Sequence, residues 1–261
     1  MNKNGATVDI ADLGVCYRRE RETVEALHGV SFRVEAGTTC AVIGPSGCGK
    51  STLLYVLAGL LRPQSGRVLI NGRDARAGRR ETSLILQDYG LLPWKTVWDN
   101  TVLGLVIRRA PADVIRSTGE EVLKQTGLWE MRRRFPAQLS GGQRQRVAIA
   151  RSLATRPDLL LMDEPFSSLD ALTRESLQET LLDILHHGGL SAVLVTHNIE
   201  EAAYLGRRIV VFTPRPGRVA AVLENPRAGD KNYRRTEQFF HLCRELRHTL
   251  EGVYPSAAEG A

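Results

Sequence analysis

The sequence lacks the long apolar segments that carry proteins into or across membranes. Its longest uninterrupted apolar stretches, such as residues 159–162 and 209–212, are far shorter than the roughly 18–20 residues of a membrane-spanning helix. Residues 1–10 are polar and contain no apolar core of a secretion signal. We therefore expect a chain that neither spans a bilayer nor is exported.

Cysteine and aromatic residues are scarce as well. The four cysteines form no Cys-x-x-Cys pair and have no histidine at zinc-like spacing, which favours reduced cytosolic thiols. The net charge of +6 is scattered, apart from short arginine clusters at 79–80 and 132–134, and no aromatic residues alternate with basic ones. We therefore expect no nucleic-acid partner, whereas a modestly positive surface suits a protein beside an anionic membrane face.

The composition that remains is that of an ordinary globular protein, with alternating strands and helices. At 261 residues, with 43% hydrophobic and 25% charged residues, the chain is long enough for one large domain or two modest ones. Apolar or alternating runs predict strands over 7–13, 30–34, 40–43, 68–72, 83–86, 158–163, 191–196, 208–212 and 218–223. Helical spacing covers 50–60, 98–139, a segment ending near 154, 171–187 and 236–252. This order predicts a mostly parallel sheet covered on both faces.

One segment between a predicted strand and a predicted helix has the sequence of a phosphate-binding loop. It fits G-x-x-x-x-G-K-[ST] at every fixed position and comprises Gly44, Pro45, Ser46, Gly47, Cys48, Gly49, Lys50, Ser51 and Thr52. Backbone N–H groups of such a loop, with the N-terminus of the next helix, surround an anion. Lys50 supplies a positive charge for the β- and γ-phosphates, and Ser51 a hydroxyl for Mg²⁺. We therefore expect ATP and Mg²⁺ to bind here.

Polar residues follow three other predicted strands. Asp163 and Glu164 come directly after a buried apolar run; we expect Asp163 to hold the magnesium and Glu164 to polarise the attacking water as general base. His197 follows the next core strand, where it can meet the γ-phosphate. Gln87 ends a strand in the same way, and its amide can meet both metal and water. Standing alone, either His197 or Gln87 would be interpreted as a structural residue.

A second anion-binding end appears at the start of another predicted helix. It consists of a hydroxyl, two glycine amides and a glutamine, from Ser140, Gly141, Gly142 and Gln143. A single active site does not need two such ends. The economical interpretation is that this one serves a nucleotide held by another copy of the chain.

These motifs, in this order, resemble the nucleotide-binding subunits of ATP-binding cassette (ABC) transporters. The resemblance implies an α/β fold with a RecA-like P-loop NTPase core, an N-terminal antiparallel β-subdomain and an inserted helical subdomain. We expect the ATPase domain over 7–225, with the insertion at about 90–155, followed by a C-terminal segment, 226–261, with one amphipathic helix and a disordered tail. The resemblance also implies a head-to-tail dimer that sandwiches two ATP molecules. Asp170 would connect the two sites, and Tyr17 would lie under adenine.

A closer likeness is to the importer ATPases of the nitrate/sulfonate/taurine group. Residues 91–94, 96–97, 99–100, 162–167, 171–174 and 214–218 look like that group. Asn198 departs from the family, in which an aspartate often follows the histidine, but this leaves the ATPase assignment intact. The segment after Asn225 is less typical, so its role in regulation stays open.

The resemblance implies an ATPase that powers uptake of a small solute. Its partners would be a second ATPase subunit, integral-membrane permease subunits and, indirectly, a solute-binding protein, with the chain placed peripherally on the cytoplasmic face of the cell (inner) membrane. We expect the permease to dock near 87–98, where Tyr89, Leu91, Leu92 and Trp94 are apolar. Burial in the chain's own core is an equally good interpretation of each of these residues taken singly. The alternatives are an ATPase of an exporter or lipoprotein-release system, a non-transport ABC ATPase, and a P-loop kinase. A kinase gives the Ser140 motif no role.

Overall fold

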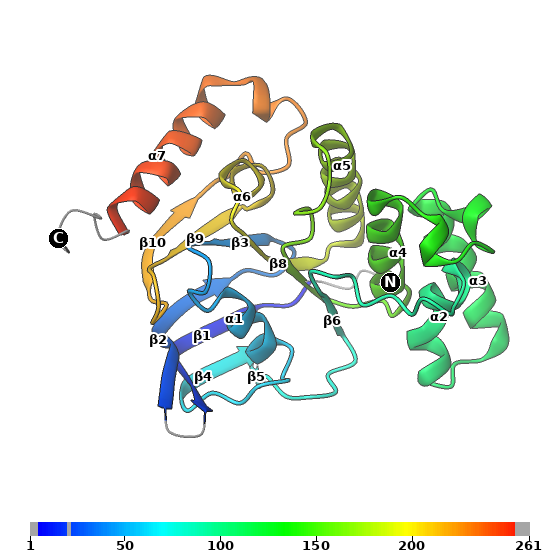
Figure 1. Cartoon of the computed structure of the whole chain (residues 1–261), viewed down its shortest axis with the longest axis horizontal. Coiled ribbons are helices and arrows are strands. Elements are labelled where there is room, and N and C mark those ends of the chain that lie inside the picture. The colour runs from blue at the N-terminus through cyan, green and yellow to red at the C-terminus, as the bar shows by residue number, and fades with distance from the viewer. Residues whose placement is uncertain (1–4, 20–21, 254–261) are drawn as a thin grey trace.

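The computed structural model describes residues 5–19 and 22–253, and these form two sheets with helices around them (Figure 1). The smaller sheet is antiparallel, with strand order β2-β1-β4-β5. Its strands are β1 (Val8–Arg19), β2 (Glu22–Val34), β4 (Ser65–Ile70) and β5 (Arg73–Asp74). The predicted tail at 255–261 lies outside the described residues.

The larger sheet has the order β10-β9-β3-β8-β7-β6 and is parallel except at the edge strand β10. Its strands are β3 (Thr39–Ile43), β6 (Thr82–Ile85), β7 (Leu159–Asp163), β8 (Ser191–Thr196), β9 (Arg208–Phe212) and β10 (Val219–Glu224). Every residue of β3, β7 and β8 is buried, as expected for parallel strands covered on both faces. The predicted parallel sheet is confirmed.

Successive residues of the central strands point into two different hydrophobic clusters. Cys40 and Val42 of β3 belong to the cluster that also contains α1 (Lys50–Leu57) and the inner side of the small sheet. Ala41 and Ile43 belong to the cluster on the opposite face, beneath α5 (Ala171–Gly188), α6 (Ile199–Leu205) and α7 (Glu237–Val253). The chain therefore forms layers with the large sheet in the middle (Figure 1).

A group of helices is inserted between β6 and β7. It contains α2 (Val97–Ile107), α3 (Ala112–Gln125), α4 (Gly141–Ala154) and the short 3₁₀ turns η1 (Trp129–Met131) and η2 (Pro136–Gln138). Thr96 begins α2 with a reciprocal cap, because its hydroxyl accepts from the Asp99 N–H and the Asp99 carboxylate accepts in return. Helix α4 contacts α2 and α3 on one side and β6 and α5 on the other. It thus connects the helical group to the large sheet.

The sequence-based predictions were wrong about several element lengths. The strands predicted at 7–13 and 30–34 are parts of much longer strands, because β1 shifts register against β2 between Ile10 and Cys16 and so loses the simple alternation. Helix α1 ends at Leu57 rather than 60. The patterns also missed β5, α6 and the 3₁₀ turn η3 (Tyr233–Arg235), all of seven residues or fewer.

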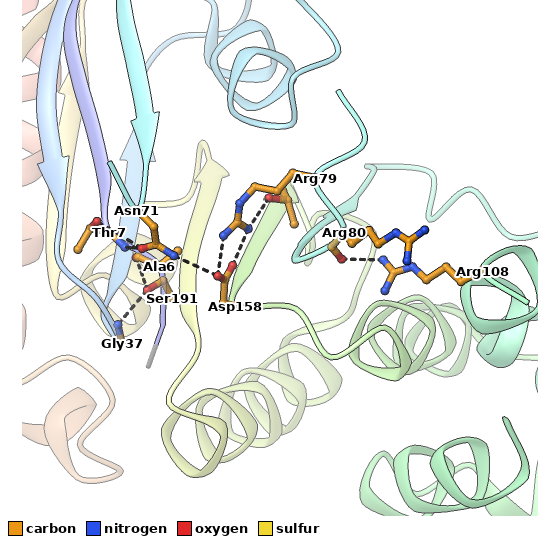
Figure 2. A network of polar contacts seen from close by, with 10 residues as sticks. Ala6, Thr7, Gly37, Asn71, Arg79, Arg80, Arg108, Asp158 and Ser191 are labelled. Atoms are coloured by element: carbon orange, nitrogen blue, oxygen red, sulfur yellow. Dashed lines mark hydrogen bonds and ion pairs between the residues drawn. The ribbon is translucent and has the colours of Figure 1, made fainter. Parts of the chain in front are cut away.

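The two sheets are joined by a partly buried polar network around Asp158, just before β7 (Figure 2). Arg79 donates two hydrogen bonds of 2.6 Å to the Asp158 carboxylate, and the Asn71 amide donates a third at 3.2 Å. Asn71 also accepts from the Thr7 N–H at 2.9 Å, beside β1. The Ser191 hydroxyl donates to the Ala6 carbonyl oxygen at 2.7 Å. These contacts fix the small sheet against the amino ends of β7 and β8.

Candidate functional site

The phosphate-binding loop lies between β3 and α1, as its spacing predicts. It borders a cavity of about 500 Å³, which is lined by Ser46, Gly47, Gly49, Lys50, Ser51 and Thr52 together with residues from distant segments. Gly49 has a φ of 100° and would, with a Cβ, place that atom 2.7 Å from the Ala26 carbonyl oxygen. Only glycine fits there, and its conformation turns the chain into α1 with the helix N-terminus at the cavity.

Three loop residues form the wall behind the cavity rather than its surface. Gly44, Pro45 and Cys48 are buried, and burial raises the pKa of the Cys48 thiol. The Lys50 ammonium donates hydrogen bonds of 2.8 Å to the carbonyl oxygens of Gly44 and Pro45. These bonds hold a positive charge at the centre of the loop, where it can meet a phosphate oxygen.

Oxygen-bearing side chains meet beside Lys50. The Ser51 hydroxyl donates to the Asp163 carboxylate at 3.1 Å, which joins the start of α1 to the carboxyl end of β7. Desolvation by burial raises the pKa of Asp163, although the Ser51 hydrogen bond opposes the shift. Gln87, just beyond β6, lines both this cavity and the neighbouring hollow of about 600 Å³ that Asp163 and Ser51 also line.

This donor set fits a magnesium ion held jointly with a phosphate. Mg²⁺ prefers oxygen ligands and is commonly bound by one or two carboxylates plus phosphate oxygens. The described residues contain no group of three or more His, Cys, Asp or Glu side chains that could enclose a metal. Ser51, Asp163 and Gln87 supply oxygen atoms of this kind beside the cavity.

Glu164 and His197 face each other across the carboxyl ends of β7 and β8. Glu164 Oε1 and His197 Nδ1 are 3.1 Å apart, and both residues line the cavity. The Glu164 N–H donates to the Val195 carbonyl oxygen at 3.0 Å, which fixes the turn after β7. The Glu164 side chain is 20% exposed and that of His197 is 58% exposed. A carboxylate so placed can accept a proton from water in the cavity.

Tyr17 of β1 also lines the cavity, together with Val24 and Ala26 of β2. Its hydroxyl is 3.1 Å from the Thr52 hydroxyl of α1, and 37% of the residue is exposed. An aromatic ring held by its hydroxyl and open on one side offers a flat surface for a base.

The Ser140 motif and Asp170 are not brought to this cavity. Ser140 caps α4: its hydroxyl accepts from the Gln143 N–H at 3.3 Å, and the Gln143 side chain accepts from the Ser140 N–H at 3.0 Å. Asp170 caps α5 by accepting from the Thr173 N–H at 3.0 Å, a bond that lowers the pKa of its carboxyl group. Gly142 allows these two helix ends to approach, because a Cβ there would lie 2.5 Å from Thr173 Cγ2.

Sequence reasoning missed three residues that line the cavity. Val24, Ala26 and Arg215 come from segments with no phosphate-binding motif. In the sequence, Arg215 stands out only as part of the run at 214–218 that looks like the importer group. The structure also accounts for asparagine at position 198, where the family often has aspartate. The Asn198 side chain caps α6 by accepting from the Glu201 N–H at 3.0 Å, a role that aspartate fills equally well.

A parallel sheet with a phosphate loop after β3, acidic residues at the end of β7 and a histidine after β8 defines a P-loop nucleotide-binding protein. Residues 27–167 match the ABC transporter family. Similar proteins include the taurine import ATP-binding protein TauB of Rhizobium johnstonii, 43% identical over 242 residues, which are 90% of this chain and 92% of that protein. The bicarbonate transport ATP-binding protein CmpC of Synechococcus elongatus is 46% identical over 76% of this chain and 30% of its own length.

Solved structures show the same relationship. The dimeric post-hydrolysis state of the ATP-binding cassette MJ0796, bound to ADP and Pi, has a TM-score of 0.74 and 32% identity, over 83% of this chain and 98% of that one. CbiO1 from Clostridium perfringens, part of the transporter complex cbiONQ, has a TM-score of 0.75 and 26% identity, over 92% of this chain and 98% of that one. The chain belongs to the ABC transporter family.

Proposed function

We propose that this chain is the ATP-hydrolysing subunit of an ABC importer for a small solute. The observation that carries the proposal is the convergence of Lys50, Ser51, Glu164 and His197 on one cavity beside a phosphate loop. The similar proteins named for taurine import and bicarbonate transport match this chain over three-quarters of its length or more. They favour a small solute with an acidic group, of the nitrate, sulfonate or taurine kind.

We assign a task to each residue of the site. Lys50 and the loop amides bind the β- and γ-phosphates of ATP. Ser51 and Asp163, with Gln87, would hold Mg²⁺, which when bound neutralises charge on those phosphates. Glu164 accepts the proton of the attacking water, a role that commonly contributes ~10²–10⁴-fold. His197 is positioned by its 3.1 Å contact with Glu164 and meets the γ-phosphate.

We place the second half of each site on a partner copy. Within one chain, the described cavity lining does not include Ser140, Gly141, Gly142 or Gln143. The N-terminus of α4 nevertheless presents N–H groups suited to an anion. A head-to-tail dimer supplies that anion as the γ-phosphate held by the other copy, and Asp170, at the adjacent end of α5, connects the two sites. The dimeric cassette structures favour this arrangement.

The conformational change that accompanies ATP binding and hydrolysis must be passed to permease subunits in the membrane. Among the described residues, no helix is long and apolar enough to cross a bilayer. Of the apolar residues expected to dock, Tyr89 is buried and its hydroxyl contacts the Ser168 hydroxyl, whereas Trp94 is 70% exposed. We therefore assign docking to Trp94 and the surrounding turn. We place the chain peripherally on the cytoplasmic face of the inner membrane, coupled indirectly to a solute-binding protein.

The Glu164→Gln variant tests the hydrolytic role. It should bind ATP like the parent, lose turnover by about 10²–10⁴-fold and remain dimeric in ATP and Mg²⁺ when followed by light scattering. Glu200→Gln, an exposed glutamate in the first turn of α6, is the matched control and should hydrolyse ATP at the parent rate. Turnover at the parent rate by Glu164→Gln would show that another group is the base.

The Ser140→Arg variant tests the shared site. An arginine there should block ATP-driven dimerisation and hydrolysis while the monomer still binds nucleotide. Ser117→Arg places the same side chain on an exposed turn of α3 and should change neither. Loss of nucleotide binding by the Ser140→Arg monomer would contradict a site in trans.

Co-purification with an integral-membrane protein separates transport from the alternative of a non-transport ATPase.

A further inference from the structure

Arg215 reaches the nucleotide cavity from a loop that carries no phosphate-binding motif. The loop connects β9 to β10, and Arg215 is the residue of this loop that lines the cavity. Strand β9 pairs in parallel with β3, so its carboxyl end lies next to the start of the phosphate loop. The pairing of β9 with β3 therefore places Arg215, in the turn after β9, beside the nucleotide cavity.

The loop is fixed against the site by its backbone. The Gly217 N–H donates to the Ala26 carbonyl oxygen at 2.9 Å, and the Gly217 carbonyl oxygen accepts from the His28 N–H at 3.0 Å. A Cβ at Gly217 would lie 2.1 Å from the Cys48 carbonyl oxygen, so the chain passes tightly between β2 and the phosphate loop. Arg215 is two residues away from this anchor, which limits where its guanidinium can reach.

Residues of the small sheet form the part of the cavity lining next to the Arg215 loop. Strand β2, to which Gly217 is bonded, contributes Val24 and Ala26 to the lining, and Tyr17 lies on the neighbouring strand β1. The phosphate end already has the Lys50 ammonium and the loop amides. Arg215 is exposed, and no described residue forms a hydrogen bond or ion pair with its side chain. The Arg215 guanidinium, at the rim of the cavity, is therefore available to a bound nucleotide.

We propose that Arg215 binds the nucleoside end of ATP and ADP, with its planar guanidinium packed on the base or bonded to the ribose opposite the Tyr17 side. The proposal rests on the proposed function, since it assumes that ATP occupies the cavity. Guanidinium groups stack on flat aromatic systems and also donate several hydrogen bonds, which suits both parts of a nucleoside. Because the contact does not involve the γ-phosphate, it strengthens ATP and ADP binding alike.

The test compares nucleotide affinities of purified chains by titration calorimetry. Arg215→Ala should weaken ATP and ADP binding by a similar factor, about 3–20-fold, with kcat at saturating ATP within about twofold of the parent. Arg215→Lys should restore only part of the affinity, because an ammonium cannot stack as a plane. Arg218→Ala removes another exposed arginine of the same loop that does not line the cavity, and should bind ATP like the parent.

Inorganic tripolyphosphate with Mg²⁺ provides the decisive probe, since it lacks the nucleoside. Arg215→Ala should bind it as tightly as the parent does; an equal loss for tripolyphosphate and ATP would overturn the proposal. Unchanged ATP affinity in Arg215→Ala, or the same loss in Arg218→Ala, would also overturn it. Lys50→Ala separates the two levels of inference: if that variant binds ATP like the parent, the proposed function fails together with the Arg215 proposal.

Discussion

Replacing Asp158 with alanine removes the carboxylate that joins the two sheets, and we expect a large loss of stability. The carboxylate accepts two hydrogen bonds from Arg79 and one from Asn71. Its backbone carbonyl oxygen also accepts from the Ala6 and Ser191 N–H groups, which alanine preserves. The substitution therefore isolates the contribution of the side chain.

The magnitude follows from burial. The Arg79 and Asp158 side chains are 17% and 11% exposed, so truncating Asp158 leaves a guanidinium largely removed from water and without its counter-charge. Breaking such a pair costs about 3–5 kcal/mol, because the remaining charge keeps its desolvation penalty. For a chain of this size, that free energy lowers the melting temperature by roughly 6–20 °C.

Thermal unfolding of the nucleotide-free chain, followed by circular dichroism, measures the effect. Asp74→Ala is the matched control, because it breaks an ion pair with Arg67 that is about two-thirds exposed and should leave the melting temperature unchanged. The double variant Arg79→Met with Asp158→Leu removes both charges and should melt closer to the parent than Asp158→Ala does. If Asp158→Ala melts like Asp74→Ala, the reasoning from burial is refuted.

Three further outcomes are expected. Gly217→Ala should weaken ATP binding and lower the melting temperature, since its Cβ would lie 2.1 Å from the Cys48 carbonyl oxygen; parent-like calorimetry and melting would contradict this. Leu246→Ala in α7 should cost about 2–5 kcal/mol in urea unfolding, because this leucine is fully buried; a smaller loss would mean that α7 contributes little to the core. Burial raises the pKa of Glu201 above its ordinary value of 4.5, so the native state binds this proton more tightly than the unfolded state does. The parent therefore loses stability as the pH rises from 4.5 to the pKa of Glu201 in the native state. Glu201→Gln should therefore gain stability relative to the parent as pH rises from below 4.5, whereas a pH-independent difference in urea midpoint would contradict the raised pKa.

The sequence was a reliable guide where chemistry depends on fixed local spacing. The phosphate loop needs glycines, Lys50 and Ser51 at set intervals, and the structure has this segment between a buried strand and a helix as expected. The sequence predicts Glu164 beside the attacking water and His197 at the γ-phosphate, because each follows a core strand. In the structure the two side chains are 3.1 Å apart, since β7 and β8 pair in parallel. The catalytic tasks assigned to them stay predictions until the variants are measured.

The sequence was a poor guide where the outcome depends on contacts between distant segments. Tyr89 and Trp94 are both large aromatic residues in the connection between β6 and α2, yet the first is buried against Ser168 and the second is exposed, and local pattern does not distinguish them. The length of β1 was missed because its register shifts interrupt the alternation that marks a strand.

The sequence alone determined that this chain carries a P-loop, its acidic partners and a second anion-binding helix end, because each depends on residues adjacent along the chain. Only the tertiary structure decided that Arg215 and Val24 share the cavity with Lys50, since sheet pairing brings these segments together. It also decided that the Ser140 helix end lies outside the cavity of its own chain. The physical reason is that backbone conformation follows local sequence, whereas proximity of distant segments follows from how the sheets pair and which faces are buried.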